Sequence, residues 1–371
     1  PNRADRRPES CPVKDWEATD PVEGIQRMMD QIMVGPALKY ARDLLAELDR
    51  EPADLVITSE MLPGVMAACE SRGQRMAIFA ANLCFYPLPG MPAFGPGFSP
   101  PRNTEEAALH EQVKAGTIQM LDTGLDSFNR TRMQLGLVPL QHVSDQINTA
   151  KLFLLGTSQT FDFPAESIPE KIRYVGPQLD EPAWTKAWTS PWPNEDTRPL
   201  IAVGFSTTFQ NHSQVLQNVL DAAESLPIRL LVTLGPIEAS ELRPTANAVL
   251  VQSAPHDAVM RQAKVVVTHG GHGTVMRALK HQCPMLILPH GRDQGENAIR
   301  ITERGAGLCL TADASCEQIE EALRQLIEEP SFSEAAARMG KAIQAEIDQS
   351  PVVPILEGLV SCEKEQTCLA G

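Results

Sequence analysis

The chain has 371 residues, a formal net charge of −15 and a hydrophobic content of 43%. This length is enough for two domains, and the acidic balance argues against a surface that binds nucleic acid or anionic membranes. No apolar run approaches the roughly 20 residues of a membrane-spanning helix, so no integral membrane segment is predicted.

The eight cysteines are scattered, and none forms a C-x-x-C pair. Scattered cysteines in apolar segments are typical of free thiols in a reducing compartment. We therefore predict a cytoplasmic protein with no structural metal site, either a monomer or a homodimer.

The first half of the chain predicts few strands. Residues 1–21 are predicted to form a loop, and apolar spacing predicts one helix over 22–49. Residues 87–101 hold six prolines and three glycines, which predicts a long loop of the kind that is often functional. The other predicted elements are strands at 54–58, 76–80, 151–155 and 172–175, and helices at 62–72 and, with interruptions, from Thr104 to about Leu135.

The second half alternates strands with helices, which predicts a parallel, doubly wound sheet. A stretch rich in proline and tryptophan precedes it and predicts a linker between two domains. Strands are predicted at 200–205, 228–234, 249–252, 265–268, 285–288 and 307–310, and helices at 213–225, 257–263, 275–281, 296–303 and 316–328. The predicted division is a first domain at 1–180, a linker at 181–198, a second domain at 199–350 and a final segment at 351–371.

A glycine-rich turn, His269-Gly-Gly-His-Gly-Thr274, follows the β-branched strand that ends at Thr268 and precedes a helix. Free N–H groups and the positive end of the helix dipole make such a turn an anion site, and its glycines let the backbone approach a phosphate. The turn lacks the G-x-G-x-x-G pattern, so a dinucleotide site is not predicted.

A second polar turn ends in Asp293 and Gln294 and follows the strand at 285–288. A carboxylate accepts hydrogen bonds from two hydroxyls, and an amide both donates and accepts, so this pair suits a polyol. Because the carboxyl ends of parallel strands meet at one edge of a sheet, the two turns together suggest a site for a sugar nucleotide.

These residues resemble the donor-binding signature of the family 1 UDP-glycosyltransferase superfamily, and most of all its bacterial macrolide glycosyltransferase-like branch. The resemblance rests on Ala254-Pro255-His256, Thr268–Thr274 and Gly291-Arg-Asp-Gln294. It implies an α/β fold of the GT-B type, with two Rossmann-like doubly wound parallel-sheet domains facing a cleft.

The resemblance also implies which residues bind the donor. Ser206, Thr207 and Thr208 would contact phosphate, and Ala254, Pro255 and His256 the base. His269, Gly271, Gly273 and Thr274 would hold the diphosphate, with Asp293 and Gln294 on the sugar. His272 belongs to the same turn, where it either lines the acceptor side or only fills space. Capping or turn formation also explains Ser206 to Thr208, His269 and Asp293, with Gln294 then incidental.

The activity implied is inverting, metal-independent transfer of a sugar, with glucose from UDP-glucose as the first choice, and no cofactor. The acceptor would be a hydrophobic hydroxylated molecule such as a polyketide, macrolide or phenol, with Phe85 and His290 on its side of the site. Two alternatives stay open: transfer from a dTDP-deoxysugar, and a non-catalytic glycosyltransferase-like auxiliary protein that only binds.

The first half departs from the family pattern. The family begins with a strand and a Gly-His-x-x-Pro turn that carries the catalytic base, and no such turn occurs in the sequence. We expect that two or three strand–helix units, and the base with them, are absent from this sequence. Glu60 has two possible roles: it is either the partner of that absent histidine or a cap at the start of a helix. His110, His142, His212 and His281 are interpreted as surface or capping residues, and residues 352–360 as a helix that crosses back to the first domain.

Overall fold

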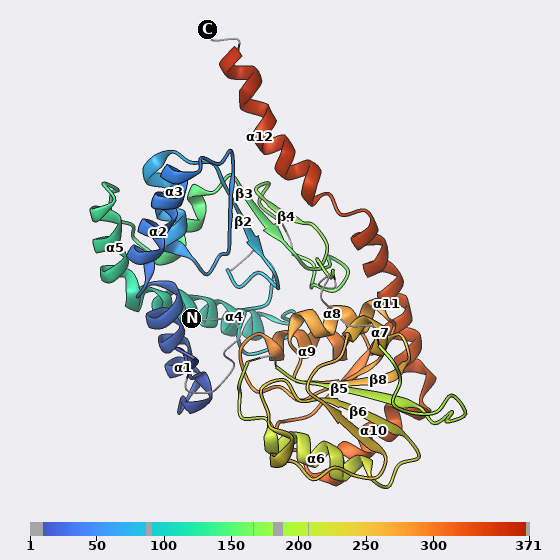
Figure 1. The fold of residues 1–371 in the computed structure, drawn as a ribbon. Helices are drawn as coiled ribbons and strands as arrows, with labels where there is room; N and C mark the ends of the chain where they lie inside the picture. Colours follow the sequence, from blue (N-terminus) through green and yellow to red (C-terminus); the bar gives the residue numbers. More distant parts are fainter. Residues whose placement is uncertain (1–9, 87–90, 166, 181–187, 207, 369–371) are drawn as a thin grey trace.

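The computed structural model describes residues 10–86, 91–165, 167–180, 188–206 and 208–368. Within these ranges the chain forms two parallel sheets flanked by helices, one from each half of the sequence (Figure 1). This arrangement confirms the predicted α/β class and the two parallel-sheet domains. Thr207 and part of the predicted linker, residues 181–187, lie outside the described residues.

The first half forms a four-stranded parallel sheet in the order β1-β2-β3-β4. Its strands are β1 (Val56–Thr58), β2 (Met76–Ala80), β3 (Leu152–Leu155) and β4 (Ile172–Tyr174). Its helices and helical turns are η2 (Asp15–Glu17), α1 (Pro21–Met28), η3 (Met29–Met33), α2 (Ala37–Arg50), α3 (Pro63–Arg72), α4 (Thr104–Leu121), η4 (Asp122–Gly124), α5 (Leu125–Gln134) and η5 (Val143–Thr149).

The prediction of one helix over 22–49 was wrong, because the helical structure is interrupted between Met33 and Ala37. Pro36 lacks the N–H that a helix interior needs. The backbone also folds back so tightly that a Cβ on Gly35 would lie 1.8 Å from the carbonyl oxygen of Asp30. Glycine followed by proline therefore ends the first helical segment and starts α2.

The second half forms a six-stranded parallel sheet in the order β7-β6-β5-β8-β9-β10. From β5 the chain moves outward through β6 and β7, then returns to β8 on the other side of β5. The strands are β5 (Leu200–Gly204), β6 (Arg229–Thr233), β7 (Ala248–Val251), β8 (Ala263–Thr268), β9 (Met285–Ile287) and β10 (Gly307–Cys309). The helices are α6 (Ser213–Ala223), the turn η6 (Ala239–Glu241), α7 (His256–Met260), α8 (His272–Lys280), α9 (Gln294–Glu303), α10 (Cys316–Glu328), α11 (Pro330–Asp348) and α12 (Val352–Cys368).

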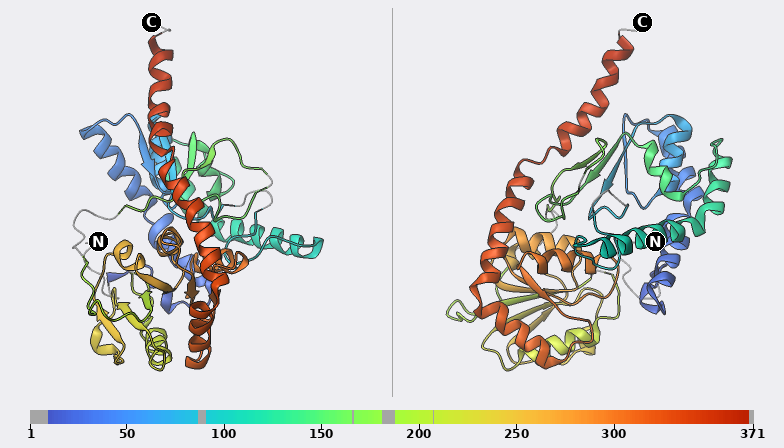
Figure 2. Two further views of the ribbon diagram at one scale, coloured as in Figure 1. Left: turned by 90° about the vertical axis from the view of Figure 1, so that its right-hand side faces the viewer. Right: turned by 180° about the vertical axis from the view of Figure 1, so that it is seen from behind.

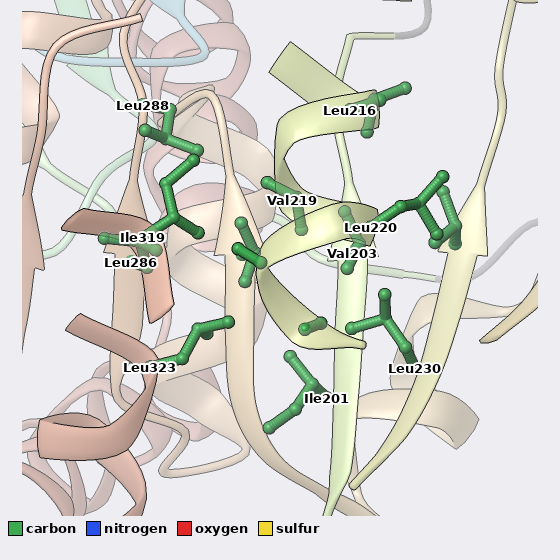
Figure 3. Packing of buried hydrophobic residues seen from close by; sticks show 14 of the residues in the cluster. Ile201, Val203, Leu216, Val219, Leu220, Leu230, Leu286, Leu288, Ile319 and Leu323 are labelled. Carbon is green, nitrogen blue, oxygen red and sulfur yellow. The ribbon is translucent and has the colours of Figure 1, made fainter. Parts of the chain in front are cut away.

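Helices cover both faces of this second sheet. On one face, leucines and valines of α6 and α10 pack against β5, β6 and the segment that starts with β9 (Figure 3). On the other face, buried side chains of α8 and α11 pack against the same strands. Strands buried on both faces form continuous apolar runs, as the sequence of β5 and β8 does.

Three helices begin earlier than predicted. α7 begins at His256, α8 at His272 and α9 at Gln294, whereas starts at 257, 275 and 296 were predicted. For α8 the reason is that Gly271 takes the N-cap position with an extended backbone, so the following Gly273 and Thr274 fit into the first turn. The glycine-rich turn is therefore shorter than predicted, because residues 272–274 belong to α8.

The two halves meet along α9. Its Arg300 side chain is 3% exposed and lies between two buried carboxylates, Asp162 of the first half and Glu296 of its own helix. One guanidinium nitrogen lies 2.8 Å from Asp162 Oδ1 and another 3.1 Å from Glu296 Oε2. The guanidinium also lies 4.5 Å from the ring centroid of Phe163, and Tyr174 donates a hydrogen bond to the other oxygen of Asp162.

The end of the chain also touches the first half. Glu346 of α11 accepts hydrogen bonds from the backbone N–H groups of Gln159 and Thr160. α12 then extends away from α11 past the strands of the first sheet, and Arg75 donates to the carbonyl oxygen of Val360 (Figures 1 and 2). Within the described ranges, no helix combines the length and the apolar character needed to cross a membrane.

The ion-pair network at α9 predicts a large stability effect. Arg300→Ala leaves Asp162 and Glu296 buried without their counter-charge, which should lower the free energy of unfolding by about 3–5 kcal/mol. Urea unfolding measures this loss. The exposed pair of Arg324 with Glu320 provides the control, and Arg324→Ala should cost less than about 1 kcal/mol. Equal losses in the two variants would contradict this account of the interface.

Candidate active site

β9, β8 and β5 are neighbours in the second sheet, and because they are parallel their carboxyl ends lie at the same edge. The chain reverses direction across the sheet between β5 and β8, and in open α/β sheets such a point leaves a crevice at the carboxyl ends of the strands. The residues that follow these strands are Phe205 and Ser206, His269 and Gly270, and Leu288 to His290. Most of the residues predicted to bind the donor therefore lie around this crevice.

The turn after β8 places the imidazole of His269 against the N-cap of α8. A Cβ on Gly271 would lie 2.7 Å from His269 Nε2, so glycine at the N-cap makes room for the ring. Gly270 has φ +93°, and a Cβ there would lie 2.8 Å from Ile287 Cγ2. The Thr274 N–H donates to Gly271 O at 3.0 Å, and the His272 backbone hydrogen-bonds to the Asp293 carboxyl. An anion beside His269 would therefore meet the Gly273 N–H and the positive end of the helix dipole.

His269 belongs to a cluster of rings around Phe205. The ring centroid of His212 lies 5.7 Å from that of His269 and 4.4 Å from that of His290, and all three imidazoles lie within 6.0 Å of the Phe205 ring. Burial, and after it the neighbouring His290, lower the pKa of His212 to about 2 and of His269 to about 4. Burial also lowers the pKa of His290. These imidazoles are therefore neutral near pH 7 in this structure.

A cation lies at the edge of this cluster. Arg292 has φ +56°, and its guanidinium donates to Thr208 Oγ1 at 3.1 Å and to both oxygens of Asp15 at 2.6 and 2.9 Å. Burial raises the pKa of Asp15, but the hydrogen bonds and charge of Arg292 outweigh this and keep it below the usual value. Ser206 Oγ in turn lies 3.0 Å from Thr208 Oγ1, so the hydroxyls predicted to bind phosphate lie next to a guanidinium.

The second polar turn is tied to the glycine turn. Asn297 Nδ2 donates to Gly270 O at 2.9 Å and to Asp293 Oδ2 at 3.0 Å. Burial raises the pKa of Asp293, against hydrogen bonds from Asn297 and the backbone of His272 and the charge of Arg292. The Asp293 carboxyl is therefore held at the N-terminal end of α8, beside the proposed anion position.

Gln294 points into the protein. Its side chain is 1% exposed, its Oε1 accepts from the backbone N–H of His290 at 2.6 Å, and its Nε2 lies 3.2 Å from the Gln210 amide. The amide predicted to bind a sugar thus stabilises the loop at His290 in this structure.

The side predicted to hold the base is formed by α7. Pro255 takes its N-cap position, His256 is its first residue, and partly buried Ala254 packs on the apolar cluster behind it. Asp257 anchors α7 on α8, because its carboxylate accepts from Arg277 at 2.8 Å and lies 2.5 Å from His281 Nε2. The position of the base-side residues is therefore fixed relative to the anion position.

Two predicted residues lie between the halves or within the first half. His272 is 6% exposed, and its Nε2 lies 2.8 Å from Thr157 Oγ1 of the first half. Glu60 is 4% exposed and accepts a hydrogen bond from Ser59 Oγ, and burial raises the pKa of its carboxyl against that bond. Tyr86 donates to the backbone carbonyl of Glu60.

The two residues predicted on the acceptor side have different surroundings. His290 lies in the imidazole cluster. Phe85 lines a cavity of about 10 Å³ between the halves, which has room for about one water molecule. The residues around that cavity are Cys84, Phe85, Tyr86, Met91, Pro92, Phe94, Glu296 and Arg300.

The sequence analysis missed two residues of the site. His212 was interpreted as a surface or capping residue, and it does take the N-cap position of α6, but it is 1% exposed and its ring lies beside that of His269. His110, interpreted in the same way, is also buried, at 5% exposure. Arg292 was quoted within the family signature without a role. Its position directly before Asp293 was the only available signal. In the described part of the chain, no three His, Cys, Asp or Glu side chains are placed to hold a metal ion.

Comparison with known proteins shows the fold and the family that the chain is similar to. Residues 217–359 match the family described as erythromycin biosynthesis protein CIII-like, C-terminal domain. The chain is 28% identical over 347 residues to 4'-demethylrebeccamycin synthase of Lentzea aerocolonigenes, a match that covers 89% of this chain and 79% of that protein. These similarities support the predicted resemblance to the family 1 glycosyltransferases of the bacterial macrolide-type branch.

A second relative matches over a shorter stretch, and a solved structure matches over most of the chain. A 3-alpha-mycarosylerythronolide B desosaminyl transferase of Saccharopolyspora erythraea is 29% identical over 200 residues, which cover 52% of this chain and 46% of that protein. The solved structure of the glycotransferase of kitacinnamycin superposes with a TM-score of 0.72 at 18% identity, covering 92% of this chain and 84% of that one. The chain therefore has the predicted GT-B fold.

The buried histidines predict how stability changes with pH. The folded-state pKa of His212, His269 and His272 lies below the usual value of about 6.5, so the unfolded chain binds more protons below that pH. Their stabilising contribution is complete above about pH 6.5 and is lost as the pH falls, by about 1.4 kcal/mol per pH unit for each histidine.

Urea unfolding between about pH 6.5 and 5 measures this slope. His272→Gln can keep the contact with Thr157 but removes one titrating group, so its slope should be shallower by about 1.4 kcal/mol per pH unit. An unchanged slope would show that His272 is protonated in the folded protein.

Proposed function

We propose that this protein transfers a sugar from a nucleoside-diphosphate sugar to a hydroxyl of an apolar small molecule, with inversion and without a metal. The observation that carries the proposal is the start of α8, where His269 and Gly271 lie beside the carboxyl of Asp293. An anion-binding helix end next to a sugar-binding carboxyl is the arrangement that a nucleotide sugar requires.

In the proposed reaction, the acceptor oxygen forms a bond to the anomeric carbon while the bond from that carbon to the diphosphate breaks. The electron pair leaves with the β-phosphate, and a base takes the acceptor proton. The Gly273 N–H of α8 and the Thr274 hydroxyl stabilise the developing negative charge. His269 adds to this, because a diphosphate beside a neutral imidazole raises its pKa and draws a proton onto it.

The base itself is not assigned to a residue of this sequence. We propose Glu60 as its partner, because a buried carboxylate that accepts a hydrogen bond from an imidazole fixes the tautomer and stabilises the cation. Glu60 suits this role through its burial and its position next to Tyr86, which lines the cavity between the halves. We propose that this cavity, which Phe85 also lines, opens to admit the acceptor.

Two nucleotides compete as donors. UDP-glucose is our first choice from the Asp293–Gln294 pair. A dTDP-deoxysugar is supported by two similar proteins: the relative named a desosaminyl transferase, and the solved glycosyltransferase VinC, which was obtained in complex with dTDP and has a TM-score of 0.63 at 19% identity.

The test is release of the nucleoside diphosphate by the full-length protein, with UDP-glucose or a dTDP-sugar and a panel of phenolic and macrolide acceptors. We expect acceptor-dependent release that falls about 10- to 100-fold in Asp293→Asn and His269→Ala, since each loses a charge-assisted hydrogen bond. Arg324→Ala, an exposed surface change, should keep wild-type activity.

Three other results would be informative. A product that retains the anomeric configuration would contradict inversion. Nucleotide that raises the melting temperature without any release would favour the auxiliary binding protein. Equal activity in Asp293→Asn and the wild type would contradict the assignment of the sugar contact.

A further inference from the structure

One segment of the first half, residues 91–102, docks along α9. Glu296 Oε1 accepts hydrogen bonds from the backbone N–H groups of Gly95 and Gly97, both at 2.8 Å. Seven residues further on, Glu303 Oε1 accepts from Ser99 Oγ at 2.6 Å and from Arg102 at 3.1 Å. Seven residues are about two helical turns, so both carboxylates lie on the same face of α9.

The contact is tightest at the first turn of the helix. Gly97 has φ +71°, and a Cβ there would lie 2.9 Å from the carbonyl oxygen of Gly295. Backbone therefore packs directly on backbone, which only glycine at position 97 allows.

Both oxygens of Glu296 are committed. Oε1 accepts the two glycine N–H groups, and Oε2 lies 3.1 Å from Arg300. The side chain is 1% exposed. An amide cannot replace it without loss, because its NH₂ group would have to face either the Arg300 guanidinium or the two N–H donors.

The same helical turn borders both proposed substrate sites. Asp293 immediately precedes α9, after two residues with positive φ, Gly291 and Arg292. Glu296 lines the cavity that we propose for the acceptor, together with Met91 and Phe94 of the docked segment. A ligand that fixes Asp293 thus also fixes the turn to which this segment is bound.

We propose that Glu296 is a positioning residue that couples occupancy of the donor site to the placement of residues 91–102 beside the acceptor. The proposal rests on the proposed function, because it needs a nucleotide that engages the start of α9. Nucleotide binding first holds Asp293 and the first turn of α9. Glu296 then holds Gly95 and Gly97, which shape the acceptor cavity.

Hydrogen exchange of peptides from residues 91–102 tests this coupling, with the full-length protein alone and with saturating UDP-glucose or a dTDP-sugar, whose sugar Asp293 is proposed to bind. In the wild type, the nucleotide should slow exchange of this segment about tenfold, within the usual range of coupling between two sites. Glu296→Gln and Gly97→Ala should lose this response. Gly136→Ala is the matched control, since Gly136 has φ +77° but an added Cβ would meet nothing within 4 Å.

Each other outcome overturns part of the proposal. Slower exchange around α8 without a change in residues 91–102 would overturn the coupling and leave the donor site intact. No nucleotide effect around α8 would overturn the donor site, and the coupling with it. A full response in Glu296→Gln would overturn the role of Glu296. Loss of the response in Gly136→Ala would show that general backbone strain is the cause, which also overturns the proposal.

Discussion

The site depends on a constraint of the second sheet: its strands are buried on both faces, so polar groups can gather only at the strand ends. At the carboxyl end of β5 the chain runs towards β6, and at the neighbouring β8 it runs the other way. The loops after these strands therefore diverge and leave a crevice between them. Phe205, His269 and His290 follow the ends of β5, β8 and β9 and pack their rings together, and α8 begins directly after the turn that follows β8.

α9 connects this crevice with the rest of the molecule. Its start carries Asp293, its first turn holds the segment at 91–102, and Arg300 near its end binds Asp162 of the first half. Buried charge at such a junction is costly to desolvate and is tolerated only when its partners are in place. The relative position of the two halves is therefore specified by side chains of the same helix that carries a donor residue.

Much of this architecture could be predicted from the sequence. The apolar runs at β5 and β8 marked buried parallel strands, and the glycines after β8 marked the turn at the start of α8, where the anion site is proposed. The single helix over 22–49 was wrong because apolar spacing outweighed Gly35 and Pro36 in that prediction. The chemistry of a buried histidine such as His212 could not be predicted, because its burial depends on strands distant in sequence.

Contacts between the halves were also beyond sequence reasoning. The sequence analysis gave Glu296 and Arg300 no role, and only the structure shows that they are buried and paired with Gly95, Gly97 and Asp162. Gln294 shows that a residue of the signature can also have a structural role. Its place in the signature suggested a ligand contact, whereas in this structure its amide braces the backbone of His290.

Calorimetric titration of UDP and dTDP tests the central claim, a nucleoside-diphosphate site at the start of α8. Wild-type protein should bind at least one of them. Gly270→Ala should weaken binding about tenfold or more, since its Cβ would meet Ile287 and Gln294, whereas Gly305→Ala, with φ +66° and open space, should not. The account is contradicted if neither nucleotide binds the wild type, or if Gly270→Ala binds as tightly as the wild type does.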